Sequence, residues 1–90
     1  NVIERMVRAI PRIDKVVDIG AGLGFDLGIV KAAHPECMAI GVEMSTECLP
    51  QLTRVADEVI ALNIESEPLP FADSSIDLMM ANQVLEHTKE

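Results

Sequence analysis

The sequence predicts an α/β fold, in which a parallel sheet of about four strands is flanked by helices. Four short apolar runs, rich in β-branched residues, recur along the 90 residues and are typical of strands buried on both faces. Segments with helical spacing separate the first three runs, and strands that alternate with helices indicate parallel βαβ units. The expected strands are residues 15–19, 37–42, 59–62 and 76–81.

Helices are expected at residues 1–10, 26–33 and 45–56. In the first, the apolar residues fall on one stripe and Pro11 ends the pattern, as Pro35 does for the second. Ser45 is predicted to cap the third helix. Pro50 lies about one turn inside that helix and should bend it or delay its start. Residues 82–87 are expected to begin a further helix.

Composition and charge exclude several classes of protein. With 49% hydrophobic and 24% charged residues the chain is globular, and no apolar run approaches the roughly 18 to 20 residues that span a bilayer. Fifteen acidic and seven basic side chains give a net charge of −8, which repels phosphate backbones. Only two aromatic residues are present, too few for a platform on which bases could stack. We therefore expect no nucleic-acid partner and no membrane association.

The start of the chain and its cysteines predict whether the domain is complete and in which compartment the protein lies. The sequence begins at Asn1 without a Met or the layout of a signal peptide, which predicts one incomplete domain over 1–90, cut from a longer chain. Cys37 and Cys48 have neither CxxC spacing nor a histidine at ligand spacing. We expect buried, reduced thiols in a cytoplasmic protein, and no metal site.

A glycine-rich turn, Gly20–Gly24, joins the first expected strand to its helix. Sheets of this kind bind nucleotide-like ligands at such turns, because glycines let the backbone approach the ligand and the helix N-terminus offers free N–H donors. A tight turn with no ligand is the alternative. Glu43 ends the second strand about 20 residues further on, where an acid that accepts ribose hydroxyls is expected. The dinucleotide fingerprint would need glycine in place of Phe25, and no P-loop Gly-Lys-Ser/Thr follows.

Three motifs in order resemble a known family. Residues 18–24 read D-I-G-A-G-L-G and resemble the D-x-G-x-G-x-G motif of class I S-adenosylmethionine-dependent methyltransferases. Glu43 resembles their acid after the second strand. Residues 69–78, L-P-F-A-D-S-S-I-D-L, with V-L-E-H at 84–87, are similar to the signature of the type 11 group. The resemblance implies the cofactor-binding half of a Rossmann-like methyltransferase, with the strands in the spatial order third, second, first, fourth.

The resemblance further implies a site for S-adenosyl-L-methionine. Its residues would be Asp18, Gly20, Ala21, Gly22, Gly24, Glu43, Met44, Asn63, Ile64, Glu65 and Asn82. The glycine turn would line the methionine moiety of the cofactor, with Asp18 supporting the turn or reaching the amino group through water. Asn82, just past the fourth strand, would close that end of the pocket.

At the other end of the implied site, Glu43 would bind the ribose and Met44 would lie against the adenine. The family often has an acid that contacts the adenine amino group after the third strand. Here either Asn63 or Glu65 could make that contact, since an amide oxygen also accepts a hydrogen bond. Ile64 would offer a backbone N–H.

Methyl transfer from a sulfonium is an in-line displacement, in which the enzyme mainly aligns the reactants and removes a proton if the acceptor requires it. No motif identifies a base. His87 is expected at the carboxyl edge of the sheet and is the one candidate, although a packing role is the commoner one. Residues 81–84, A-N-Q-V, lack the Asn-Pro-Pro-aromatic motif of related amino-group methylases. This argues against DNA adenine methylation and favours a small-molecule acceptor.

Two other functions remain open. A nicotinamide-dependent oxidoreductase is disfavoured by Phe25, and a catalytically silent interaction module has no need for Asp18, the glycines and Glu43 together. The fourth strand, 76–81, would be a sheet edge with only one charge, Asp77. Bare edges recruit other strands. This predicts either further strands from a longer parent chain or a homodimer paired through the fourth strand.

Overall fold

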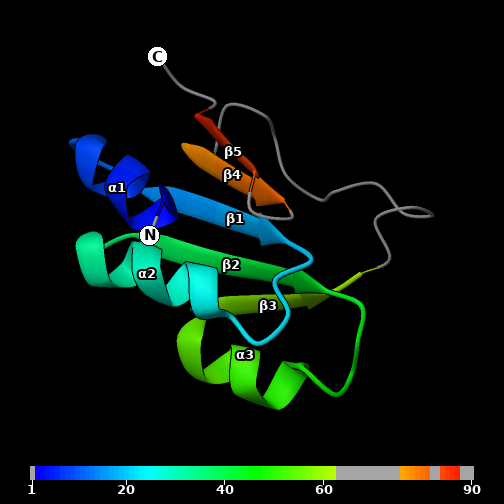
Figure 1. Ribbon diagram of the computed structural model, residues 1–90. Coiled ribbons are helices and arrows are strands. Elements are labelled where there is room, and N and C mark those ends of the chain that lie inside the picture. Colours follow the sequence, from blue (N-terminus) through cyan, green and yellow to red (C-terminus); the bar gives the residue numbers. More distant parts are fainter. Residues whose placement is uncertain (1, 63–75, 82–83, 88–90) are drawn as a thin grey trace.

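A computed structural model describes residues 2–62, 76–81 and 84–87 of the chain (Figure 1). Its elements are α1 (Val2–Ala9), β1 (Lys15–Ile19), α2 (Phe25–Ala33), β2 (Met38–Glu43), α3 (Leu49–Val55), β3 (Glu58–Ala61), β4 (Leu78–Ala81) and β5 (Val84–His87). The strands form one sheet in the order β3-β2-β1-β4-β5. The first four are parallel, which confirms the α/β fold and the spatial order that the resemblance implied.

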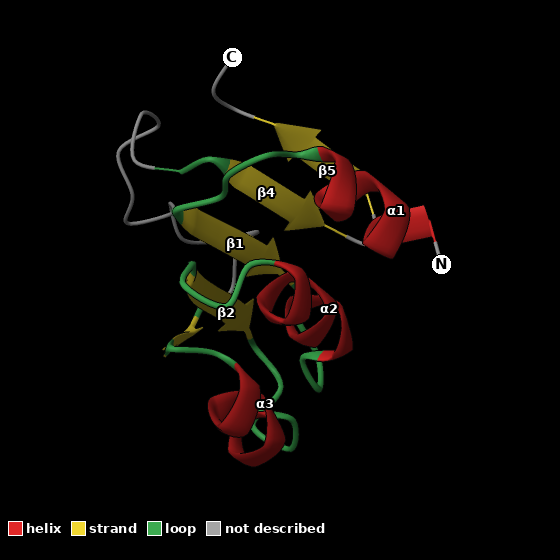
Figure 2. Ribbon diagram, turned by 90° about the vertical axis from the view of Figure 1, so that its left-hand side faces the viewer, coloured by secondary structure: helices red, strands yellow, loops and turns green. Residues whose placement is uncertain are grey.

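The three helices lie on one face of the sheet (Figures 1 and 2). Their apolar stripes meet the strand residues that point to that face, and together they form the larger buried cluster. Its fully buried members include Val7, Leu27 and Leu52 from the helices and Val16 and Met80 from the strands. The alternate strand residues point to the other face and form a second cluster. Burial on both faces explains why these strands are almost entirely apolar.

Leu52 of α3 sets how closely that helix approaches the sheet. A Cβ at Gly41 of β2 would lie 2.9 Å from Leu52 Cδ1, and a Cβ at Gly24 would lie 3.0 Å from the same atom. Leu52 is fully buried, so its side chain has little room to move aside and both positions favour glycine. Close packing of α3 thus depends on one glycine in the sheet and one in the turn before α2.

The third helix begins later than the sequence predicted. It starts at Leu49 with Cys48 as its N-cap, and no side chain caps it. Ser45 therefore does not cap the helix, and its backbone N–H donates to Glu43 instead. Pro50 lies in the first turn, where its missing N–H costs nothing, so the delayed start predicted from it is confirmed. Both thiols are free; Cys37 is buried as expected, whereas Cys48 is only half-buried.

The helix expected to begin within 82–87 is wrong for residues 84–87, which form β5, and residues 82–83 lie outside the described residues. This strand pairs antiparallel with β4, and Ala81 lies opposite Val84. The open edge of β4 has unpaired backbone N–H and C=O groups, and residues 84–87 form hydrogen bonds to them as an antiparallel strand. Consequently β4 is not the sheet edge, and the edge on which the predicted dimer relied is covered by β5.

A buried carboxylate, that of Asp77, joins the amino ends of β1 and β4. Asp77, only 7% exposed, accepts backbone N–H bonds from Asp14 (2.8 Å) and Lys15 (2.9 Å) through Oδ2. Its own N–H donates to the carbonyl of Lys15, so this residue joins the start of β4 to the start of β1. One acid of the type 11 signature therefore has a structural role at the edge of the sheet opposite the glycine turn.

Asp57 makes a similar junction between α2, β2 and β3. It accepts from the N–H of Ala39 (2.8 Å) and from Lys31 Nζ (2.9 Å). These two bonds hold the pKa of Asp57 below its usual value. Among the described helices, none is long and apolar enough to cross a membrane.

Candidate functional site

The glycine turn folds over the carboxyl end of β2. Gly20, Gly22 and Gly24 have φ values of +70°, +58° and +88°, in the left-handed region that favours glycine. The N–H groups of Gly20 (2.8 Å) and Ala21 (3.1 Å) both donate to the carbonyl of Val42. The turn between β1 and α2 is therefore hydrogen-bonded to the neighbouring strand β2 as well as within itself.

The helix after the turn begins at Phe25, and its first amides lie at the carboxyl edge of the sheet. Gly24 is the N-cap and offers no side chain to the free N–H groups of the first turn. Gly24 also supplies the close packing against Leu52, the kind of contact that the third glycine makes in the dinucleotide fingerprint. Because Gly24 makes this contact, position 25 does not have to be glycine, and 74% of the surface of Phe25 is exposed.

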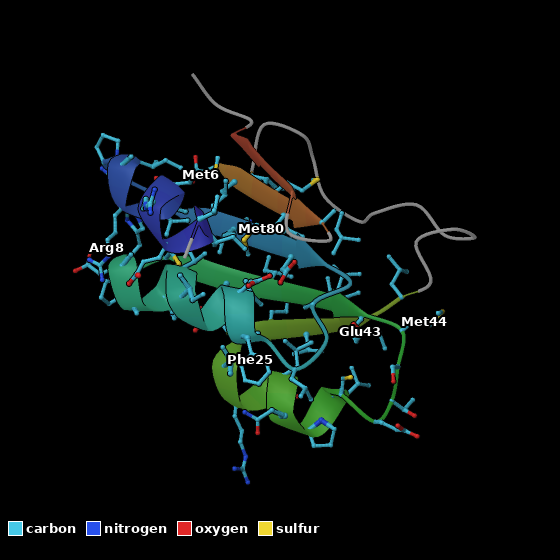
Figure 3. All side chains as sticks on the ribbon, in the orientation of Figure 1. Met6, Arg8, Phe25, Glu43, Met44 and Met80 are labelled. Atoms are coloured by element: carbon cyan, nitrogen blue, oxygen red, sulfur yellow. The ribbon has the colours of Figure 1, made fainter. Side chains whose placement is uncertain are left out.

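Glu43 connects the glycine turn to the loop that follows β2. Its Oε1 accepts the N–H of Gly22 at 2.6 Å, and its Oε2 accepts the N–H of Ser45 at 2.9 Å. The predicted acid and the predicted glycine turn thus meet, although they are 21 residues apart in the sequence. Met44 follows at the end of β2, and Figure 3 shows it beside Glu43. Met44 is 63% exposed, and its contact with adenine stays a prediction.

Asp18 lies near the end of β1 and is only 4% exposed. Burial raises the pKa of Asp18 to about 7, and the nearby carboxylates of Asp26 and Glu43 act in the same direction. Three acids therefore surround the base of the glycine turn, and their combined field favours a cationic group.

Asp26 was missed by the sequence reasoning. It lies in the first turn of α2, where an acid is stabilised by the helix dipole. Its position two residues after the last glycine of the turn was the signal that could have placed it near Asp18.

Several predicted residues cannot be placed. Asn63, Ile64, Glu65 and Asn82 lie outside the described residues. His87 is in β5, and its backbone pairs with Leu78 at the amino end of β4. The expectation that His87 lies at the carboxyl edge of the sheet is therefore wrong, because the chain reverses direction after β4. This position separates it from the glycine turn and weakens it as a candidate base.

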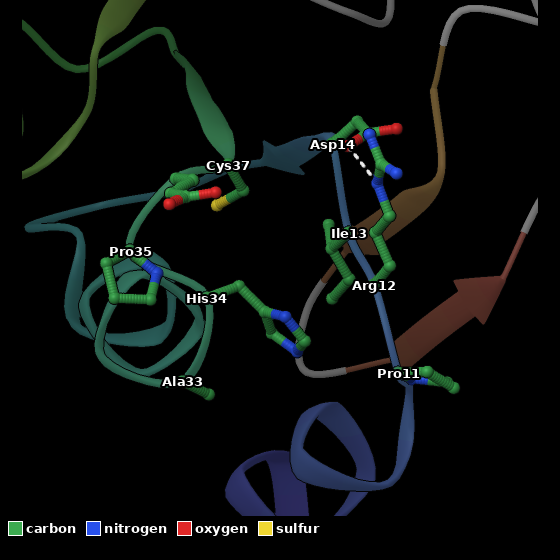
Figure 4. A pocket seen from close by; sticks show the side chains of 9 residues that line it. Pro11, Arg12, Ile13, Asp14, Ala33, His34, Pro35 and Cys37 are labelled. Atoms are coloured by element: carbon green, nitrogen blue, oxygen red, sulfur yellow. Dashed lines mark hydrogen bonds and ion pairs between the residues drawn. The ribbon is translucent and has the colours of Figure 1, made fainter.

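A depression of about 690 Å³ lies at the opposite edge of the sheet (Figure 4). It is formed by the segments before β1 and β2 and includes Arg12, Asp14, His34 and Cys37. Arg12 Nε is paired with Asp14 Oδ1 at 2.8 Å, and His34 Nε2 lies 2.7 Å from the carbonyl oxygen of Val7. None of the predicted cofactor residues lines this depression. The candidate site is therefore the carboxyl edge, around the glycine turn.

The chain is similar in sequence to known methyltransferases. A family model described as "Methyltransferase domain" matches residues 17–90. A malonyl-[acyl-carrier protein] O-methyltransferase of Methylococcus capsulatus is 31% identical over 75 residues, which are 80% of this chain and 27% of the relative. An uncharacterized 37.1 kDa protein in transposon TN4556 of Streptomyces fradiae is 33% identical over 81 residues, 86% of this chain and 24% of the relative. The chain thus spans about a quarter of the length of these curated relatives.

Solved structures share the fold. The sugar N-methyltransferase KedS8 from Streptoalloteichus superposes with a TM-score of 0.65 at 22% identity, over 89% of this chain and 32% of that one. The plantazolicin methyltransferase BpumL, solved in complex with SAH, gives a TM-score of 0.68 at 17% identity, over 88% and 33%. These two structures show the shared fold, and the family match does not favour a nicotinamide-dependent oxidoreductase.

Proposed function

Since this chain belongs to the methyltransferase domain family, we propose that it supplies the cofactor-binding part of an enzyme that transfers a methyl group from S-adenosyl-L-methionine to a small-molecule acceptor. The observation that carries the proposal is the contact between Glu43 and Gly22. It places a carboxylate suited to ribose hydroxyls directly beside a turn suited to the methionine moiety.

The residues present fit this cofactor. A Cβ built at Gly22 would meet nothing within 4 Å, so the turn faces open space that a side chain would otherwise occupy. Asp18 offers a buried carboxylate close to that turn. A sulfonium and an ammonium group are both cationic, and the acids at the base of the turn would stabilise them. When bound, the cofactor would supply the activated methyl group.

Each part of the chain would then have a distinct task. Asp18 would attract the ammonium end of the cofactor, Glu43 would accept the ribose hydroxyls, and Met44 would pack against the adenine. Asn63 or Glu65 would read the adenine amino group. The backbone N–H of Ile64 would contact the base, and Asn82 would close the methionine end, as the family resemblance implies.

The acceptor is proposed to be a small molecule because a net charge of −8 opposes a nucleic acid. The acids beside the turn would also repel an anionic acceptor, which favours a neutral or cationic one.

Calorimetric titration of the intact protein tests the proposal. S-adenosylmethionine and S-adenosylhomocysteine should both bind, whereas NAD should not. A G22V variant should lose binding, because its side chain would occupy the space beside the turn and would strain the backbone at φ +58°. G28A in the middle of α2 should keep binding, because its new Cβ meets only Val55 Cγ1 at 3.7 Å. Tight binding of NAD without binding of either sulfur ligand would contradict the proposal.

A further inference from the structure

We propose that Glu43 is a clasp that holds the glycine turn against the loop after β2 before any ligand arrives, and so fixes the shape of the site. The clasp itself does not depend on the proposed function. Its consequence for ligands, a carboxylate already oriented towards a vicinal diol, rests on that function.

The two loops are joined through this one side chain. Gly22 is the middle glycine of the turn, and its N–H donates to Oε1 at 2.6 Å. Ser45 begins the segment that leads to α3, and its N–H donates to Oε2 at 2.9 Å. The first part of the turn is held to β2 by backbone bonds to Val42, but at Gly22 only the Glu43 carboxylate takes the N–H within the described part of the chain. Hydrogen bonds to an ionised acceptor are shorter and stronger than neutral ones.

The arrangement leaves room for a ligand without breaking the clasp. An ionised carboxylate has about four lone-pair positions on two oxygens. One position on each oxygen is used by a backbone N–H, so one on each oxygen remains. Two adjacent hydroxyls on a ring would meet these two positions, and the side chain would already be immobilised when they arrive. Ordering that precedes binding raises affinity.

The chemistry of the clasp requires glutamate. Glutamine has one accepting oxygen and one NH₂ group, and the NH₂ group cannot accept from a backbone N–H. Glu43→Gln therefore releases either Gly22 or Ser45. Glu43→Asp is one methylene shorter and cannot span both amides from the end of β2.

Amide hydrogen exchange in the ligand-free, intact protein tests the clasp. In the parent protein we expect the N–H groups of Gly22 and Ser45 to be protected. In E43Q at least one of them should exchange ten or more times faster, while Gly20 and Ala21, bonded to Val42, should keep their rates. The matched control is E47Q, which removes the same charge from an exposed side chain in the same loop and should change neither rate.

Rates for Gly22 and Ser45 within twofold of the parent in folded E43Q would overturn the clasp, as would free exchange of both amides in the parent. The exchange rates of the β1 amides report whether the variant is folded. If E43Q does not fold, E43D replaces it in the experiment, because its shorter side chain also cannot reach both amides. A second arm compares adenosine with 2′-deoxyadenosine: the parent should prefer adenosine about tenfold, and E43Q should lose that preference. If exchange responds but no adenosine compound binds, the clasp stands and the proposed function fails. If adenosine compounds bind but E43Q does not change exchange at Gly22 and Ser45, the clasp fails and the proposed function stands.

Discussion

Replacing Asp18 with asparagine should make the protein more stable at high pH. Burial, reinforced by two neighbouring acids, raises the pKa of Asp18 from 3.8 to about 7. Because the folded-state pKa lies above the unfolded one, the stability that Asp18 contributes is fully present below about pH 4. It is lost as the pH rises through about 7. A pKa difference of one between the folded and unfolded states corresponds to about 1.4 kcal/mol, so the full loss is about 4 kcal/mol, of which about 2 kcal/mol falls between pH 5.5 and 8.0.

Urea unfolding of the parent and of D18N at these two pH values measures the effect. When the unfolding free energy of the parent is subtracted from that of D18N, the contributions of all titratable groups that the two proteins share cancel. We expect the advantage of D18N to grow by about 2 kcal/mol from pH 5.5 to 8.0. E36Q, which alters an exposed acid at the opposite edge of the sheet, should show no such growth. If the difference between D18N and the parent changes by less than about 0.5 kcal/mol, Asp18 is already ionised at pH 5.5 and the reasoning fails.

The same contacts lead to four more expected outcomes. Glu43→Ala should weaken S-adenosylhomocysteine binding by about 1.5 to 3 kcal/mol in calorimetry, the scale for hydrogen bonds to a charged group, and unchanged affinity in a folded variant would remove the ribose role. Binding of S-adenosylmethionine should release protons near pH 7, because its cationic groups lower the pKa of Asp18; titrations in two buffers of different ionisation enthalpy should detect this release in the parent and not in D18N. Asp77→Ala should lower the unfolding free energy by about 1 to 3 kcal/mol, because two N–H groups at the start of β1 lose their acceptor, and leave cofactor affinity unchanged. His87→Ala should leave the methylation rate unaltered, and a rate loss at constant cofactor affinity would restore it as a base.

The sheet and the centre of the site could be predicted because they depend on local pattern. Apolar runs of strand length and a glycine-rich turn are visible in the sequence, and the family resemblance implied the spatial order of β3, β2, β1 and β4. The acid at the end of β2 then has to lie at the same edge as the glycine turn, and the bond from Gly22 to Glu43 confirms that they meet.

The strand β5, the start of α3 and the role of Asp77 depend on contacts that no local sequence pattern reveals. A four-residue run such as 84–87 fits a strand or a helix equally well, and the free edge of β4 decided between them. Ser45 has the side chain of a helix cap, but its N–H is taken by Glu43 and the helix begins at Leu49. The role of Asp77 arises from residues more than 60 positions away.

The packing of Leu52 against two glycines has an evolutionary consequence. One leucine touches Gly41 in the sheet and Gly24 in the turn, so three positions share a single small volume. A larger residue at either glycine can be accepted only when position 52 becomes smaller, and φ of +88° at Gly24 restricts that position further. In related sequences these three positions should therefore vary together or not at all. The spacing of α3 from the glycine turn and from the sheet would then be inherited as a unit, whatever acceptor each relative methylates.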